Sequence, residues 1–187
     1  MYRHGKIKRM AYAAVIGAAY AAVIGAAYAA LTMVLAPISF GPIQMRVSEV
    51  LCVLPFFMPC ATWGLFIGCM IANLISAAGV WDVVFGSLAT LGSCLCIQAL
   101  GQRGKKVSSW PHIILAMLMP VVWNAFIVVG MLTWSLTETR VFQFGKQFWI
   151  FAAEVGLGEL IVMLVLGIPL LKLLEHSEWF QARTDEA

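Results

Sequence analysis

Long stretches without a charged residue dominate this chain. No Asp, Glu, Lys or Arg occurs between Arg9 and Arg46, and none occurs between Glu49 and Asp82. The chain of 187 residues is 62% hydrophobic and 11% charged, whereas soluble domains carry about 25% charged residues. So few charges cannot cover a surface that faces water. The sequence therefore predicts a membrane protein.

The apolar stretches are separated by Pro, Gly and polar clusters, which are typical of loops. A helix needs about 20 residues to cross a hydrocarbon layer roughly 30 Å thick. The chain therefore predicts an all-α bundle of six transmembrane helices in a single membrane domain, residues 1–187. The expected helices span about 10–35, 45–58, 61–77, 82–100, 111–134 and 148–174.

The basic residues lie near the ends of these segments, which is a topology signal. With six helices and an internal N-terminus, the cytoplasmic side would hold Arg3, Lys6, Lys8, Arg9, Arg103, Lys105, Lys106, Lys172 and Arg183. The opposite side would hold Arg46, Arg140 and Lys146. This excess predicts that both termini are cytoplasmic. The net charge of +3 is too small to indicate a nucleic-acid partner.

No catalytic or metal-binding pattern occurs in the sequence. It contains no GxSxG, P-loop or HExxH pattern. The cysteines show no CxxC spacing and lie within apolar segments, at positions 52, 60, 69, 94 and 96. We interpret them as small buried residues. We expect no metal, no cofactor, and no hydrolysis of ATP by this chain alone.

Polar residues crowd into the stretch 39–50, between the first two apolar segments. Pro37, Gly41 and Pro42 are expected to end the first helix and to force a loop. We expect residues 39–44 of this loop to act as a lid over the pocket. Arg46 and Glu49 follow at the mouth of an apolar helix, where a charge is costly unless it is paired or meets a ligand. Their i,i+3 spacing also allows them to pair with each other.

Polar residues in the other segments gather in the same outer half when depth is counted along each helix. Intramembrane polar residues normally face the bundle interior and mark a substrate path. The predicted substrate-binding residues are Gln44, Arg46, Glu49, Asn73, Asp82, Trp123, Asn124, Glu154 and Glu159.

Several of these residues also have a structural interpretation. Asp82 could cap its helix, and Asn73 could bond to a neighbouring helix. Either Glu154 or Glu159 could serve the ligand while the other pairs internally. Trp123 could stack on a flat ligand.

The first helix carries an octapeptide repeat, because AYAAVIGA occurs at 11–18 and again at 19–26. The repeat produces two rows of small residues at every fourth position, Gly17, Ala21, Gly25 and Ala29, and Ala14, Ala18, Ala22, Ala26 and Ala30. Such rows allow another helix to approach closely. They predict either internal packing or a docking face for a partner subunit.

Four motifs carry a resemblance to a known family. They are LAPISFGPIQMRVSE at 35–49, LFIGCMIAN at 65–73, DVVFGSLAT at 82–90 and VGLGE at 155–159. Together they resemble the QueT family of queuosine-precursor transporters over about residues 30–175. The repeat is not a feature of that family, and Cys60 stands where an acidic residue is expected.

The family is similar to the substrate-binding S components of energy-coupling factor importers. The resemblance implies six helices, an outward-facing pocket for a deazaguanine precursor of queuosine, and residence in a bacterial plasma membrane. It implies a transmembrane coupling subunit and two ATPase subunits as partners. It also implies that the small residues of the first helix dock the coupling subunit, among them Gly17, Ala18, Ala21, Ala22, Gly25, Ala26 and Ala29.

Two other functions remain open from the residues alone. An autonomous secondary transporter would use Glu154 or Glu159 as a proton relay. A membrane assembly protein would bind no small ligand.

Overall fold

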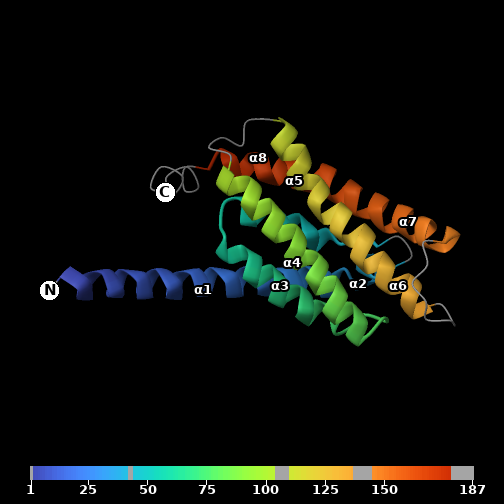
Figure 1. Cartoon of the computed structure of the whole chain (residues 1–187), viewed down its shortest axis with the longest axis horizontal. Helices are drawn as coiled ribbons and strands as arrows, with labels where there is room; N and C mark the ends of the chain where they lie inside the picture. Colours follow the sequence, from blue (N-terminus) through green and yellow to red (C-terminus); the bar gives the residue numbers. More distant parts are fainter. Residues whose placement is uncertain (1, 42–43, 104–109, 137–144, 178–187) are drawn as a thin grey trace.

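The structure is a computed structural model that describes residues 2–41, 44–103, 110–136 and 145–177. Within these ranges every regular element is helical (Figure 1), which confirms the all-α prediction. The elements are α1 (Tyr2–Val34), α2 (Ala36–Ser39), the 3-10 helix η1 (Val47–Phe56), α3 (Cys60–Asn73), α4 (Val80–Arg103), α5 (Trp110–Trp123), the π-helix η2 (Asn124–Val128), α6 (Val129–Leu136), α7 (Lys146–Val162), the π-helix η3 (Met163–Gly167) and α8 (Ile168–Glu175).

Successive segments of the chain run along the bundle in alternating directions (Figure 1). α5, η2 and α6 follow one another without a break and form one pass, and so do α7, η3 and α8. Four segments of the described chain are long and apolar enough to cross a membrane, Ile7–Val34, Val80–Gln102, Trp110–Trp134 and Lys146–Glu175. The other two passes, η1 and α3, are shorter apolar helices. The count of six membrane spans therefore stays a prediction.

Contacts between passes identify the two ends of the bundle. At one end a Cβ atom on Gly101 would collide with the carbonyl of Phe56, and the Lys172 Nζ lies 4.1 Å from the ring centroid of Trp110. The start of α1 and the end of α8 lie toward this end (Figure 1). The side chains of Arg46 and Asp82 meet at the opposite end. The predicted orientation also used residues 105, 106, 140 and 183, which lie outside the described residues.

α1 and α3 are in backbone contact. A Cβ atom on Gly25 would lie 2.5 Å from the carbonyl oxygen of Gly64. Cβ atoms on Gly64 and Gly68 would collide with the carbonyls of Ala21 and Gly25, respectively. Such close approach is what small residues at every fourth position permit. The N-terminal half of α1 extends beyond the rest of the bundle (Figure 1).

The element boundaries differ from the expected ones where proline and glycine act locally. Pro37 does not begin a loop, because proline is tolerated in the first turn of a helix and here starts the short helix α2. The third helix ends at Asn73 instead of position 77, and a turn leads to Gly79, whose φ of 62° is left-handed. The expected helix 45–58 is the 3-10 helix η1, which spans ten residues and contains Pro55.

The main hydrophobic core lies between α1, η1, α3, α4, α5 and the η3–α8 segment. Tyr28, Leu65 and Ile97 are among its fully buried side chains. Cys52, Cys69 and Cys94 are also fully buried in this core, while Cys60 and Cys96 are half-buried, and all five are free thiols. These positions agree with the interpretation of the cysteines as small apolar residues.

Candidate functional site

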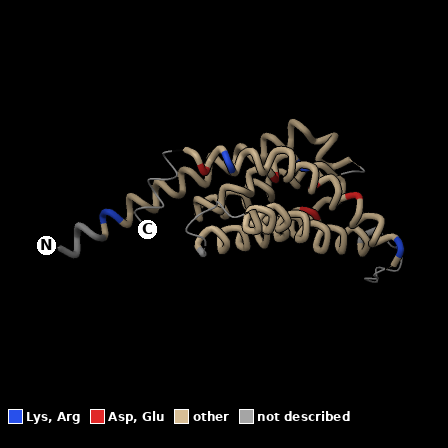
Figure 2. The backbone as a smooth tube through the Cα atoms, turned by 90° about the horizontal axis from the view of Figure 1, so that it is seen from above, with Lys and Arg blue, Asp and Glu red and all other residues tan. Residues whose placement is uncertain are grey.

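The charged residues are few along the helices, and some of the acidic ones lie well inside the bundle (Figure 2). Six of the nine predicted site residues are at most 2% exposed: Arg46, Glu49, Asn73, Asp82, Asn124 and Glu159. Burying such groups is costly unless each finds a partner. Their contacts therefore decide which of them hold the fold and which remain available for a ligand.

Arg46 and Asp82 form a buried ion pair, in which Arg46 Nη2 lies 3.2 Å from Oδ2 and 3.3 Å from Oδ1 of Asp82. Asn73 Nδ2 donates a hydrogen bond of 2.9 Å to the main-chain carbonyl of Asp82. A Cβ atom on Gly86 would lie 2.6 Å from Asp82 Oδ1, so glycine is needed beside this carboxylate. Arg46 is thus paired across the bundle with Asp82, and not with Glu49 three residues away.

The environment of Arg46 keeps it charged. Burial by itself lowers the pKa of the Arg46 guanidinium, but the Asp82 carboxylate together with the nearby Cys69, Tyr28 and Glu49 side chains more than offsets this effect. The pKa of Arg46 is therefore raised above its ordinary value. A permanent cation consequently lies against α4. At the same end of the bundle, the ring centroid of Phe40 lies 5.5 Å from Cζ of Arg46.

Glu49 is surrounded by protein donors. Its Oε1 accepts a hydrogen bond of 2.6 Å from the Tyr28 hydroxyl and one of 3.0 Å from the Thr90 hydroxyl. Its Oε2 accepts one of 3.0 Å from the Cys52 thiol. The carboxylate thus joins η1 to α1 and α4. These contacts give Glu49 a structural role, and its predicted role in ligand binding stays untested.

Other buried polar atoms have no hydrogen-bond partner among the described residues. Ser39 Oγ in α2 is one of them. We call the others the unpartnered set: Arg46 Nη1, Asn73 Oδ1, Ser87 Oγ, both side-chain polar atoms of Asn124, and Glu159 Oε1. The electrostatic neighbours of Glu159 are Glu49 and Arg46, which places it close to η1. Buried polar groups in folded proteins nearly always have partners. The unpartnered set is therefore the strongest candidate for a ligand site.

One member of the unpartnered set lies in an irregular turn, and another lies four residues before a second one. Asn124 begins the π-helix η2, where its carbonyl accepts the Val129 amide five residues on. The Glu159 carbonyl accepts the Met163 amide as the π-helix η3 begins. Pro120 lies one turn before η2, within α5. Single π-turns are frequent at functional sites, so these irregularities indicate the same region as the unpartnered atoms.

A pocket of about 370 Å3 opens at the end of the bundle that holds the ion pair. We call it the Asp82 pocket; its lining comprises Phe40, Gln44, Ser76, Ala77, Ala78, Asp82 and Leu132. Two residues of the predicted lid, Phe40 and Gln44, therefore line a pocket, while Pro42 and Ile43 lie outside the described residues. The sequence analysis gave Phe40 only as part of the predicted lid, and it missed Ser87. The position of Ser87 on a polar face of α4, between Asp82 and Thr90, was the signal that could have found it.

The remaining predicted residues are less buried. Gln44, Trp123 and Glu154 are all half-buried. The Trp123 ring packs on α4, since a Cβ atom on Gly92 would lie 2.7 Å from its Cε3. Stacking of Trp123 on a ligand, and any ligand contact of Glu154, stay predictions.

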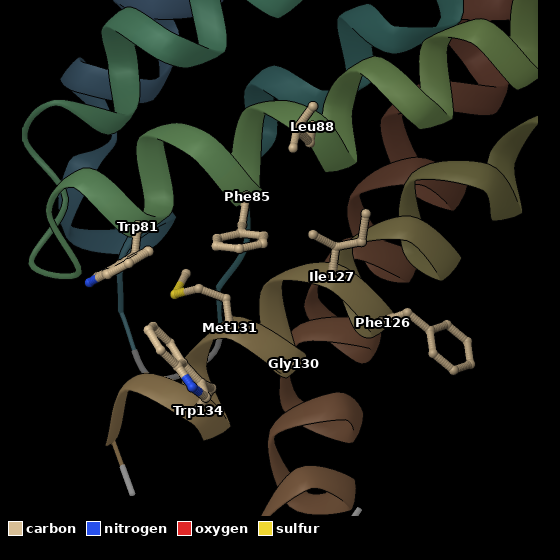
Figure 3. Close-up of a pocket in the computed structure, with 8 residues that line it drawn as sticks. All are labelled: Trp81, Phe85, Leu88, Phe126, Ile127, Gly130, Met131 and Trp134. Carbon is tan, nitrogen blue, oxygen red and sulfur yellow. The ribbon is translucent and has the colours of Figure 1, made fainter. Parts of the chain in front are cut away.

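A second hollow of about 640 Å3 lies between α4 and the η2–α6 segment (Figure 3). Its lining carries no charged side chain and consists of Trp81, Phe85, Leu88, Phe126, Ile127, Gly130, Met131 and Trp134. Trp81 and Trp134 meet edge to face at 4.8 Å. A wall of this kind suits hydrocarbon, because it offers almost nothing to a polar ligand.

The two rows of small residues on α1 have different surroundings. Gly25 and Ala29 are buried and Gly17 and Ala21 half-buried, on the side that contacts α3. The other row, Ala14, Ala18, Ala22, Ala26 and Ala30, is exposed. A shallow groove of about 760 Å3 runs along α1 and α3 beside both rows. The first row packs internally, and the second is left free on this chain.

Comparisons with known proteins agree with this arrangement. A stretch of 61 residues, 33% of this chain, is 48% identical to the Queuosine precursor transporter QueT of Lactococcus lactis subsp. cremoris (strain MG1363). The match spans about a third, 36%, of that relative's length. No solved structure matches the chain. The family model described as QueT transporter matches residues 18–176, most of the chain. This multi-pass membrane protein therefore belongs to the QueT transporter family.

Proposed function

We propose that this chain is the substrate-binding S component of an energy-coupling factor importer, and that it captures a deazaguanine precursor of queuosine from outside the cell. The unpartnered set carries the proposal. These buried donors and acceptors come from α3, α4, the η2 region, α7 and the approach to η1. Leaving them without partners costs free energy, and a polar ligand would remove that cost on binding.

The chemistry of the unpartnered set suits a guanine-like edge. Such an edge offers N–H donors beside a carbonyl acceptor. Glu159 Oε1 and Asn73 Oδ1 can accept hydrogen bonds, whereas Arg46 Nη1 and Asn124 Nδ2 can donate them. An aminomethyl substituent would add a cation, which favours a buried carboxylate. The printed name of the Lactococcus relative, a queuosine precursor transporter, supports the same ligand class.

The exposed row of α1 is the proposed docking face for the coupling subunit. The row holds Ala18, Ala22 and Ala26, and it flanks the groove along α1 and α3. Its small side chains would let another helix approach closely. Two ATPase subunits would complete the importer, since this chain contains no nucleotide-binding pattern. The proposed setting is a bacterial plasma membrane, with six spans and cytoplasmic termini.

A second candidate function is an autonomous, proton-coupled transporter of a purine-like compound. Glu159 favours it, because a buried carboxylate with an unpartnered oxygen could carry a proton. Uptake by vesicles that contain this chain alone, and its collapse with a protonophore, would support this candidate.

A binding titration of the purified chain tests the proposed function. Guanine, 7-deazaguanine, its aminomethyl derivative and queuine should be compared in detergent without ATP. We expect tight binding of at least one deazaguanine and weaker binding of guanine. Absence of binding to every deazaguanine would contradict the proposal.

The docking face has its own test, with a matched pair of variants. Ala22→Leu adds bulk on the exposed row, whereas Gly25→Leu adds it where α1 meets the Gly64 carbonyl. We expect Ala22→Leu to abolish co-purification with the coupling subunit and to preserve ligand binding. Gly25→Leu should destabilise the chain itself. Intact complexes with Leu at 18, 22 and 26 would contradict docking on this row.

A further inference from the structure

The Arg46–Asp82 pair connects the Asp82 pocket with the unpartnered set. Asp82 lines the pocket, and Arg46 Nη1 belongs to the set. Along α4, Ser87 follows Asp82 by five residues, toward the far end of the bundle. Along the η2–α6 segment, Asn124 precedes the pocket residue Leu132 by eight residues, which is about 12 Å of helix. Both segments therefore place two members of the unpartnered set, Ser87 and Asn124, deeper than the pocket residues Asp82 and Leu132.

The contacts of the pair are incomplete. Only Nη2 of Arg46 reaches Asp82, at 3.2 and 3.3 Å, and Nη1 has no partner. Charge-assisted N–H···O bonds are usually shorter, about 2.7–2.9 Å. Phe40 lines the same pocket and also lies over the Arg46 guanidinium. The Phe40 ring in the pocket lining thus lies against a guanidinium that Asp82 holds loosely.

We propose that Arg46 and Asp82 form an exchangeable barrier, and that a ligand reaches the deeper atoms by taking over the hydrogen bonds of this pair. The inference rests on the proposed function. A ligand that passes must offer an acceptor to Arg46 and a donor to Asp82, because breaking a buried ion pair without replacement is strongly unfavourable. The pair therefore selects ligands with a donor and an acceptor side by side, and it excludes groups that offer neither.

A native cysteine reports whether the barrier opens. Cys69 is fully buried, with its sulfur 3.4 Å from Asn73 Nδ2 and 3.3 Å from Thr90 Oγ1. In a chain with Ser at position 52 and Ala at the other three cysteine positions, the rate of Cys69 modification by methyl methanethiosulfonate measures access to the region below the pair.

Asp82→Asn should raise this rate roughly tenfold or more, because it removes the charge that holds Arg46. Arg46→Lys keeps the positive charge but loses the planar fork, and it should also raise the rate. Ser76 lines the same pocket but is not part of the pair. The rate of Cys69 modification in the Ser76→Ala variant should therefore match that of the parent chain. Retained helical circular dichroism and a single gel-filtration peak show that each variant is folded.

The proposed barrier would be contradicted if Cys69 were modified at the same rate in the parent chain, Asp82→Asn and Arg46→Lys. A ligand arm separates this result from a failure of the proposed function. If 7-deazaguanine at saturating concentration slows Cys69 modification in the parent chain, the proposed function is supported whatever the variants do. If 7-deazaguanine, its aminomethyl derivative and queuine all fail to slow modification in the parent chain and to bind in the titration, the proposed function fails, and the comparison of rates without ligand still decides the barrier.

Discussion

Glu49 and Glu159 are two buried carboxylates with opposite surroundings. Both are at most 1% exposed, and Glu49 is an electrostatic neighbour of Glu159. Glu49 accepts hydrogen bonds from Tyr28, Thr90 and Cys52. Glu159 has an oxygen with no partner among the described residues. The same side chain at the same burial thus stabilises the fold in one place and remains available in the other.

The difference shows that a buried carboxylate is not necessarily available to bind a ligand. A buried carboxylate whose oxygens are occupied can accept little from a ligand, since a new donor must displace an existing one. A buried carboxylate with an unused oxygen gains a full hydrogen bond when a ligand arrives. The comparison therefore predicts opposite responses to the same substitution at the two positions.

The largest effect is expected for Glu49→Gln. The substitution removes the charge that three donors share, and hydrogen bonds to charged groups contribute about 1.5–3 kcal/mol each. We expect the free energy of unfolding to fall by at least about 3 kcal/mol, seen as a lower melting temperature in detergent. An unchanged melting temperature would show that the hydrogen bonds of Glu49 do not stabilise the fold. It would contradict the proposed difference between Glu49 and Glu159.

Glu159→Gln should mainly affect ligand binding. It keeps the shape of the side chain, so we expect stability to be unchanged or raised. Affinity for a cationic aminomethyl ligand should fall roughly tenfold or more, because a charge-assisted bond is worth about 1.5–3 kcal/mol. The loss should be smaller for a neutral analogue. If both ligands bind as they do to the parent chain, Glu159 is structural and Glu154 becomes the candidate.

Tyr28→Phe tests one of the bonds that hold Glu49. We expect stability to fall by about 1.5 kcal/mol and ligand affinity to be preserved. Tyr12 precedes Tyr28 by 16 residues, which is two lengths of the octapeptide repeat, and it is 69% exposed. Tyr12→Phe is therefore a matched control that should leave the melting temperature unchanged. Equal effects at the two positions would argue against a special role of the Tyr28–Glu49 bond.

Asn124→Ala should give the smallest effect, and it should change ligand affinity but not stability. Neither side-chain polar atom of Asn124 has a partner among the described residues, so its removal leaves no broken bond in the free protein. A neutral hydrogen bond contributes about 1 kcal/mol, and affinity should therefore fall about fivefold. A drop in stability without a change in affinity would assign Asn124 to the fold.

The sequence predicted the burial of most of the candidate site residues. Arg46, Asn73, Asp82, Asn124 and Glu159 are all buried, as expected for polar residues within apolar helices. The partner of Arg46 could not be predicted, because Asp82 lies 36 residues away and the nearer Glu49 offered the simpler pairing. Local spacing describes one helix, whereas these contacts depend on how separate passes are placed.

The fold was predicted to a similar degree. The all-helical bundle follows from long uncharged stretches, and most boundaries shifted by only a few residues. The geometry of η1 did not follow, since nothing local in its ten residues other than Pro55 indicates a 3-10 helix. On α1 the sequence showed two rows of small residues, but only the placement of α3 decides which row is buried.

The unequal lengths of neighbouring passes have a consequence for the surrounding lipid. The apolar part of α1, 28 residues, is about 42 Å long, whereas α3 with 14 residues is about 21 Å long. The 3-10 helix η1 adds a pass of about 20 Å. Since α1 packs directly against α3 and η1, the hydrophobic thickness of the protein changes abruptly there. Such mismatch forces lipids to stretch or thin and favours helix association. It therefore favours a neighbouring membrane protein beside α1, and this preference should vary with the acyl chain length of the bilayer.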